Sequence, residues 1–229
     1  MSDLSMLING LKVSAEGGTT FERRNPLDGS VATRAPAASP ADAVLAVEAA
    51  AEAFKSWGQT GPGARRALLL KAADALEAKT PQFIDAVSAE TGATGMWAGF
   101  NVMLAAGMIR EAASLTTQVA GEVIPSDVPG SLAMGVRQPA GVVLGIAPWN
   151  APVILGVRAI ATPLACGNTV ILKGSENCPR THQLIVEAFQ DAGFPPGVVN
   201  YLTNAPADAG AVVEAMVAQR PDLVLVSPA

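Results

Sequence analysis

Histidine and cysteine are scarce in this sequence of 229 residues, which holds one histidine, His182, and two cysteines, Cys166 and Cys178. Two cysteines exclude the disulfide-dense frameworks of small secreted domains and favour a reducing compartment. Residues 1–5 show neither the basic start nor the apolar segment of a secretory signal peptide, so we expect a cytoplasmic protein.

The small number of histidines and cysteines also limits which catalytic and metal-binding sites the chain can form. A Ser-His-Asp arrangement cannot be argued from one histidine, and the simplest expectation for His182 is an exposed position on a helix. Cys178 lies four residues before it, but two ligands do not make a zinc site, so no metal is expected. Cys166 comes between a predicted helix and a buried strand, where we expect a small apolar core residue and no nucleophile.

Positive charge is in the minority, with 15 Lys and Arg against 20 Asp and Glu and a net charge of -5. A chain with this net charge has no positive electrostatic field to attract a polyanion, which disfavours nucleic acid and anionic membranes as partners. The most apolar stretch, residues 140–160, is interrupted by Pro148, Asn150, Pro152 and Arg158, so no transmembrane helix is expected. With 50% hydrophobic residues, global disorder is also excluded.

The first half of the chain reads as hairpins followed by helices. Apolar triplets flank Asn9 and Gly10, a pair that favours a tight hairpin turn, and a second hairpin is predicted over residues 19–34. We expect both hairpins at the periphery. Helical periodicity and capping residues then predict four helices, over residues 39–58, 64–79, 80–92 and 95–119.

The second half alternates strands and helices. Short apolar runs at 142–147, 169–173, 198–202 and 222–226 are typical of strands buried on both faces. Helices are predicted after the first run and over residues 179–192 and 207–218. This spacing predicts an α/β fold, with a parallel sheet and right-handed crossovers.

Two strand-end loops carry the candidate site, although neither G-x-G-x-x-G nor the P-loop motif is present. The loop at 147–152 holds Trp149 and Asn150, and its plain alternative is a proline-rich turn that ends a strand. The next strand ends in Lys173 and is followed by Glu176, whose plain alternative is a solvated ion pair. At the carboxyl end of a parallel strand, such a carboxylate could accept hydrogen bonds from a ribose diol.

Short motifs also follow one another in a recognisable order along the chain. They occupy residues 8–10, 25–26, 57, 65–66, 90–92, 121–125, 138–143, 148–150, 166–173, 176 and 193–200. This ordered set resembles the NAD(P)-dependent aldehyde dehydrogenase superfamily. The sequence around residues 150–165 is most similar to the family's enzymes for aromatic aldehydes such as salicylaldehyde, benzaldehyde or vanillin.

The resemblance implies a Rossmann-like cofactor-binding domain and a role for each matched residue. Asn150 would be the side-chain donor of the oxyanion hole. The expected cofactor-binding residues are Ile146, Ala147, Pro148 and Trp149, which would line the cleft, and Lys173, Ser175 and Glu176 near the adenosine ribose. The carboxylate of Glu176 favours NAD over NADP as the cofactor.

The resemblance also divides the chain and implies a reaction. We expect a helical and hairpin part at 1–119, an oligomerisation hairpin at 120–138 and a Rossmann-like sheet at 139–229. The implied activity is NAD-dependent oxidation of an aldehyde to its acid by a homo-dimer or tetramer. The family's nucleophilic cysteine and general base do not match residues here, so we expect this chain alone to be inactive. The alternative is a non-catalytic dinucleotide-binding or assembly fragment.

Overall fold

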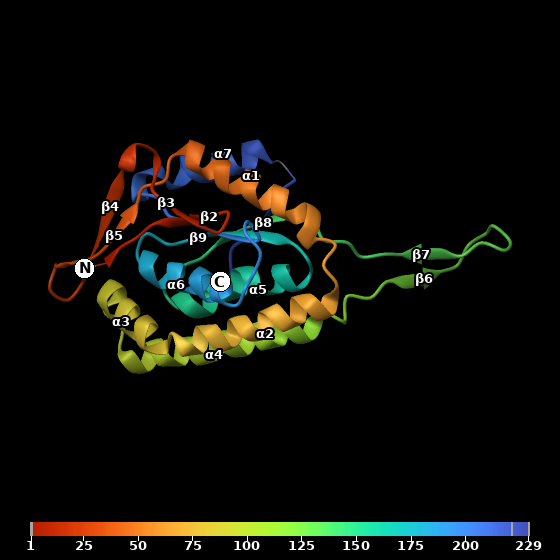
Figure 1. Ribbon diagram of the computed structural model, residues 1–229, viewed down its shortest axis with the longest axis horizontal. Helices are drawn as coiled ribbons and strands as arrows, with labels where there is room; N and C mark the ends of the chain where they lie inside the picture. Colours follow the sequence, from red (N-terminus) through yellow and green to blue (C-terminus); the bar gives the residue numbers. More distant parts are fainter. Residues whose placement is uncertain (1, 221, 229) are drawn as a thin grey trace.

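The computed structural model describes residues 2–220 and 222–228; the outer ends of the predicted segments 1–119 and 139–229 therefore lie outside the described residues. Helices cover both faces of a six-stranded sheet, and one hairpin projects from this body (Figure 1). The helices are α1 (Pro40–Trp57), α2 (Pro62–Ala78), α3 (Thr80–Thr91), α4 (Gly95–Leu115), α5 (Pro152–Ala165), α6 (Pro179–Asp191) and α7 (Ala209–Gln219). No helix in the described part of the chain is long and apolar enough to cross a membrane.

The main sheet has the strand order β11-β8-β9-β10-β2-β3. Its strands are β2 (Met6–Ile8), β3 (Leu11–Val13), β8 (Val142–Ile146), β9 (Thr169–Lys173), β10 (Val199–Leu202) and β11 (Val224–Val226). The last four run parallel, and the helices α5, α6 and α7 follow β8, β9 and β10 in turn. The predicted parallel α/β sheet is confirmed, since nearly every residue of β8, β9 and β10 is buried, as expected for strands covered on both faces.

The prediction that the first hairpin is peripheral is wrong. Met6 and Leu7 in β2 are fully buried, and Leu7 pairs with Tyr201 of β10 in the antiparallel direction. Asn9, in the turn after β2, donates its backbone N–H to the side-chain oxygen of Asn200 at 2.9 Å. The apolar triplet of β2 therefore extends the main sheet, and of the two strands of this hairpin only β3 lies at an edge.

The second hairpin forms as predicted and remains apart from the main sheet. Strands β4 (Thr20–Arg24) and β5 (Val31–Pro36) pair antiparallel, and β1 (Ser2–Asp3) joins them in a three-stranded sheet. The first long helix, α1, begins after Ser39, whose hydroxyl accepts the N–H of Asp42 while the Asp42 carboxylate accepts the N–H of Ser39. The capping prediction at this helix is confirmed.

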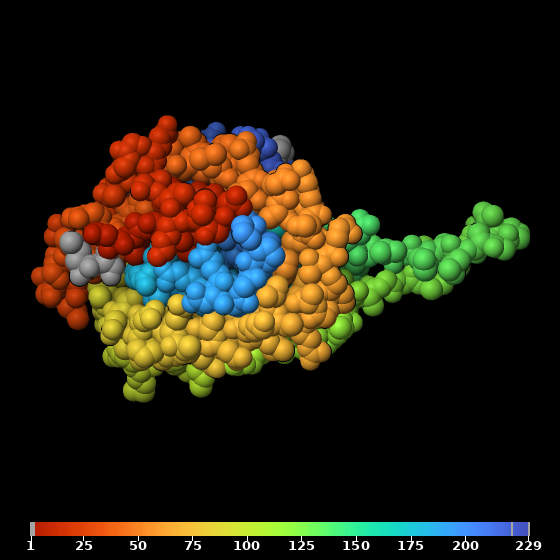
Figure 2. Space-filling model, viewed as in Figure 1, coloured from red at the N-terminus to blue at the C-terminus, as the bar shows by residue number. Residues whose placement is uncertain are grey.

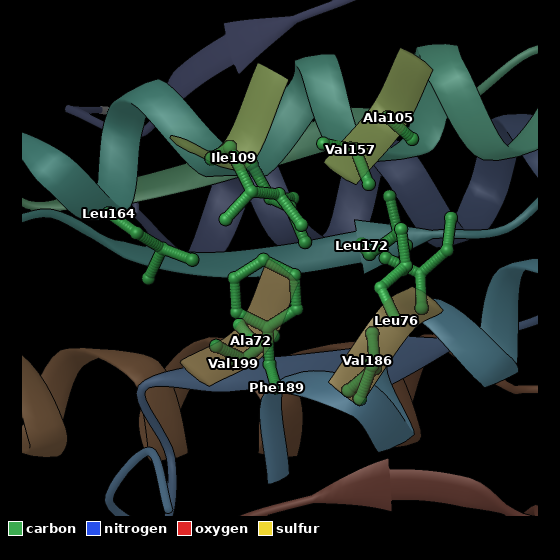
Figure 3. Close-up of a cluster of buried hydrophobic side chains, with 14 of the residues drawn as sticks. Ala72, Leu76, Ala105, Ile109, Val157, Leu164, Leu172, Val186, Phe189 and Val199 are labelled. Carbon is green, nitrogen blue, oxygen red and sulfur yellow. The ribbon is translucent and has the colours of Figure 1, made fainter. Parts of the chain in front are cut away.

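Two apolar layers hold the sheet between its helices. One layer fills the space between the sheet and helices α2 to α6, and the other lies between the sheet and helices α1 and α7. Figure 3 shows side chains of the first layer converging from helices and strands: Ala72, Leu76, Ala105, Ile109, Val157, Leu164, Leu172, Val186, Phe189 and Val199. Full burial of each larger side chain contributes about 1.5–3 kcal/mol, so the strands and helices are fixed relative to one another.

A buried carboxylate joins α3 to the beginning of α6. Glu90 accepts hydrogen bonds from the Thr33 hydroxyl at 2.9 Å, the Arg180 N–H at 2.7 Å, the Thr181 N–H at 3.0 Å and the Thr181 hydroxyl at 2.8 Å. Burial raises the pKa of Glu90, and these four donors oppose the rise. Glu90 therefore satisfies N–H groups in the first turn of α6 that have no partner within the helix.

Replacing Glu90 by glutamine should lower the free energy of unfolding by about 2–3 kcal/mol, because an amide group would face donors that need an acceptor. Denaturant unfolding followed by circular dichroism measures this change. Glu111→Gln, at an exposed position of α4, is the control and should change stability by less than about 0.5 kcal/mol. Equal effects of the two substitutions would contradict the role of Glu90.

The remaining hairpin leaves the body as a thin arm (Figure 2). Strands β6 (Glu122–Ile124) and β7 (Ala133–Gly135) pair antiparallel within it, and they pair with no other strand in the described part of the chain. Several apolar side chains of the arm are exposed: Val123, Ile124, Val128, Leu132, Met134 and Val136. An exposed apolar surface of this kind is typical of a contact surface.

Candidate functional site

The register of the sheet brings three strand ends to one edge. Ile146 of β8 lies opposite Lys173 of β9, which lies opposite Leu202 of β10. The loops 147–151 and 174–178 therefore start side by side. Parallel α/β sheets bind their ligands at the carboxyl ends of the strands, so this edge is the candidate site.

A groove of about 700 Å³ lies at this edge, between the sheet and α7. Its lining consists of Ile146, Lys173, Ala209, Gly210, Val213, Glu214, Val217 and Ala218. Most of these side chains are apolar or small, and Val217 exposes 41% of its surface. A groove with this lining suits the flat apolar face of a ligand, with the charged groups of Lys173 and Glu214 available to its polar part.

Lys173 is a buried cation at the end of its strand, with 5% of its surface exposed. Burial lowers the pKa of Lys173, and the charge of the nearby Glu176 opposes this effect. Its ammonium group donates one long hydrogen bond, 3.5 Å, to the Gly174 carbonyl. Lys173 and the half-buried Glu176 thus lie near each other at the groove end of β9, and the plain alternative of a solvated ion pair does not hold for the buried lysine.

The loop after β8 exposes two of its four candidate residues to solvent. Trp149 is 52% exposed and Asn150 is also exposed, whereas Ala147 is buried and Pro148 is half-buried. These four residues are not part of the groove lining, unlike Ile146 and Lys173. The structure therefore brings Ile146 and Lys173 into one groove and places Trp149 and Asn150 on the adjoining loop.

Ser175 and His182 interact beneath the loop that follows β9. The Ser175 N–H donates to Nδ1 of His182 at 3.0 Å, and the Ser175 hydroxyl accepts the N–H of Asn177 at 3.2 Å. Ser175 exposes 7% of its surface and His182 none. The prediction of an exposed histidine is wrong, because α6 packs this face of its first turns against α5 and the loop.

The two cysteines occupy different environments. Cys178 is fully buried, with Sγ 3.8 Å from both ring nitrogens of His182. Cys166 is half-buried at the end of α5, beside a hollow near the base of the arm that Arg65 and Arg137 also line. The predicted core position of Cys166 is thus wrong. Among the described residues, no group of three His, Cys, Asp or Glu side chains could hold a metal ion.

A second hollow, of about 650 Å³, carries charged residues on the opposite side of α6 from this site. Two of its cations are paired, Lys79 with Asp191 at 2.7 Å and Arg180 with Glu187 at 2.8 Å. Its third cation, Lys12, is an exposed side chain of β3.

Sequence reasoning missed the wall that α7 contributes to the groove. Val212 and Met216 face the core, while Val213 and Val217, one position further along the helix, line the groove. The sequence signal for this wall was a helix with apolar residues on two adjacent faces, because only one of these faces packs against the core. The role of this second apolar face follows from the fold, in which α7, the helix after β10, lies beside the end of β9 and lines the groove.

Comparison with known proteins places the chain in a family. A family model described as "Aldehyde dehydrogenase family" matches residues 12–227. The chain belongs to the aldehyde dehydrogenase family. It is 60% identical over 218 residues to the vanillin dehydrogenase of Pseudomonas fluorescens and 47% identical over 215 residues to the salicylaldehyde dehydrogenase of Pseudomonas putida.

These aldehyde dehydrogenase alignments cover 95% and 94% of this chain and 45% and 44% of the two relatives, so the chain spans about half of their length. The salicylaldehyde dehydrogenase from Pseudomonas putida G7, solved with salicylaldehyde, superposes with a TM-score of 0.93 at 47% identity, covering 95% of this chain and 45% of that one. The NAD-dependent benzaldehyde dehydrogenase from Corynebacterium glutamicum gives a TM-score of 0.89 at 29% identity, covering 98% of this chain and 54% of that one.

The comparisons confirm the resemblance to aldehyde dehydrogenases that the ordered motifs predicted, with aromatic aldehyde enzymes among the similar proteins. They also confirm the fold class, because the superposed structures belong to the same family and match nearly the whole chain.

Proposed function

We propose that this chain is the cofactor-binding half of an enzyme that oxidises an aromatic aldehyde to its carboxylic acid with NAD. The supporting observation is the groove at the ends of β8 and β9, with Lys173 inside it and Glu176 beside it, in an aldehyde dehydrogenase chain. The relatives named for vanillin and salicylaldehyde support the aromatic class, and the NAD-dependent benzaldehyde enzyme supports the cofactor. The free cysteines Cys166 and Cys178 favour a reducing, cytoplasmic location.

The groove fits the adenosine half of NAD. Ile146, Val213 and Val217 offer an apolar wall to the adenine ring. The ammonium group of Lys173 can donate to ribose oxygens, and the carboxylate of Glu176 can accept from ribose hydroxyls. Ser175 lies between these two residues, and we assign it the role of shaping their loop, since its own N–H and hydroxyl hold other groups.

The loop 147–151 would carry the chemistry at the other end of the cofactor. Ala147, Pro148 and Trp149 would line the cleft, and Asn150 would donate its amide N–H to the aldehyde oxygen. This hydrogen bond stabilises the oxyanion that forms when a thiolate adds to the carbonyl. NAD, when bound, would supply the hydride acceptor that this oxidation requires, and water would release the acid from the thioester on the cysteine.

The nucleophile in this proposal is a cysteine outside these 229 residues. Asn150 precedes α5 and Cys166 follows it, so the 14 residues of the helix separate them. At 1.5 Å per residue this separation is about 21 Å, too far for one carbonyl to meet both. Burial raises the pKa of the other cysteine, Cys178, which keeps it a thiol.

In a polypeptide of full family length that includes these residues, Asn150→Ala should lower kcat about 10²- to 10³-fold and leave the Kd for NAD nearly unchanged. Steady-state kinetics with vanillin and salicylaldehyde, and calorimetry with NAD, measure the two quantities. Gln59→Ala, an exposed amide outside the site, is the control.

A loss of NAD affinity at constant kcat would instead place Asn150 in the cofactor site. If the unmutated polypeptide binds NAD but oxidises neither aldehyde, the alternative of a non-catalytic dinucleotide-binding module gains support.

Cofactor choice tests Glu176 directly. NADP would place a phosphate with a charge near -2 beside the carboxylate, in a partly desolvated position. NAD should therefore be preferred, and Glu176→Gln should raise the NADP to NAD ratio of kcat/KM about three- to tenfold, mainly by improving NADP. Glu111→Gln is the matched control, and an unchanged ratio in Glu176→Gln would contradict the assignment.

We also propose that the arm, residues 120–138, joins copies of the chain into a homo-dimer or tetramer. Val123 and Met134 lie opposite each other in its hairpin and are 72% and 59% exposed. The double substitution Val123→Asp and Met134→Asp should reduce the mass measured by light scattering, whereas Leu11→Asp, at a 64% exposed position of β3, should leave it unchanged. Retention of the oligomer in the double variant would refute this role.

A further inference from the structure

His182 contacts the loop after β9 and the first residue of α5, which directly follows the loop after β8. Its Nδ1 lies 3.0 Å from the N–H nitrogen of Ser175, in the loop after β9. Its Nε2 lies 3.1 Å from the carbonyl oxygen of Pro152, immediately after the loop that follows β8. One side chain from α6 therefore spans the space between the ends of two neighbouring strands.

The partners of His182 determine the state of its ring. A backbone N–H can only donate and a carbonyl can only accept, so Nδ1 must be unprotonated and Nε2 must carry the proton. Burial lowers the pKa of His182 to about 4, with the charge of Lys173 contributing. The ring is thus neutral near pH 7 and held as a single tautomer.

The packing around the ring leaves it little room to move. Gly156 of α5 faces it: a Cβ at Gly156 would lie 3.2 Å from Cδ2 of His182 and 2.5 Å from Cδ1 of Ile185. Cys178 contacts the ring at 3.8 Å, and Glu90 holds the first turn of α6. The glycine allows the close approach of α5 and α6 that brings the ring within reach of both loops.

We propose that His182 is a positioning residue that sets the spacing between the loop carrying Asn150 and the loop carrying Glu176. Pro152 comes two residues after Asn150, and Ser175 comes directly before Glu176. Rotation or loss of the ring releases both backbone contacts, which lets the two loops move independently. This inference rests on the proposed function, because the spacing matters for a ligand that reaches from one loop to the other.

The experiment compares three variants of the full-length polypeptide by calorimetric titration with NAD. His182→Leu removes both contacts and should weaken NAD binding about tenfold or more, whereas His182→Gln, which keeps one acceptor and one donor, should remain within about threefold of the unmutated protein. Val186→Ala loosens the same helix one turn further on, in the core, without touching either loop. It should lower the melting temperature and leave the Kd for NAD unchanged.

A purely structural role of His182 predicts a different pattern. His182→Leu would then behave as Val186→Ala does, with a lower melting temperature and an unchanged Kd, and this result would overturn the proposal. If the unmutated protein does not bind NAD, the proposed function itself fails. This outcome differs from failure of the His182 proposal, in which the unmutated protein binds NAD and His182→Leu binds it equally well.

A measurement without substitution covers the case in which His182→Leu fails to fold. His182 is the one histidine of these 229 residues, so in a ¹⁵N NMR spectrum of this 229-residue chain its ring nitrogens can be assigned without ambiguity. The proposal requires an unprotonated Nδ1 and a protonated Nε2 at neutral pH, with slow exchange of the Ser175 amide hydrogen. The opposite tautomer, or rapid exchange of that amide hydrogen, would overturn it.

Discussion

The burial of β9 is the constraint on which the candidate site depends. All five residues of this strand are buried, including the lysine at its end, with β8 and β10 on either side and helices over both faces. A one-residue slip would move each side chain of this strand to the opposite face, where it would no longer fit the helices packed there, and would draw the charged Lys173 towards the core. Lys173 is therefore held at the edge of the sheet by the packing of Val170, Ile171 and Leu172 behind it.

Helix α6 links the strand ends of the site to the first half of the chain. The helix begins against Glu90 of α3, contacts the two loops of the site through His182, and buries Val186 and Phe189 in the core (Figure 3). The first turns of α6 thus contact the Glu90 carboxylate of α3, the Ser175 N–H of the loop after β9 and the Pro152 carbonyl of α5. The helices of the N-terminal part are in this way coupled to the strand ends of the C-terminal part by directed hydrogen bonds as well as by apolar contacts.

The sequence predicted those features that depend on neighbouring residues. The apolar runs marked β8, β9 and β10, and Ser39 with Asp42 marked the start of α1, because burial and capping act over a few residues. Ile146 and Lys173 could likewise be assigned to one edge from the rule for parallel sheets.

The errors all concern contacts between distant segments. The burial of His182 depends on Gly156 and the Pro152 carbonyl, the partial exposure of Cys166 depends on where the arm joins the body, and the groove wall of α7 depends on the position of β10. Local patterns do not give these contacts; in α7 they show only an apolar helix face that the core does not use.

The position of β2 bears on how the chain folds. Its hairpin contacts β10 through the pair Asn9 and Asn200, which are 191 residues apart in sequence. During synthesis β2 leaves the ribosome well before β10, yet its place in the sheet does not exist until β10 has formed. Closing so long a loop is entropically costly and slow, so the apolar triplet Met6, Leu7 and Ile8 must wait in an exposed state. Strand β2 is thus among the last strands to join the main sheet, and until then it is an unprotected edge that other chains can pair with.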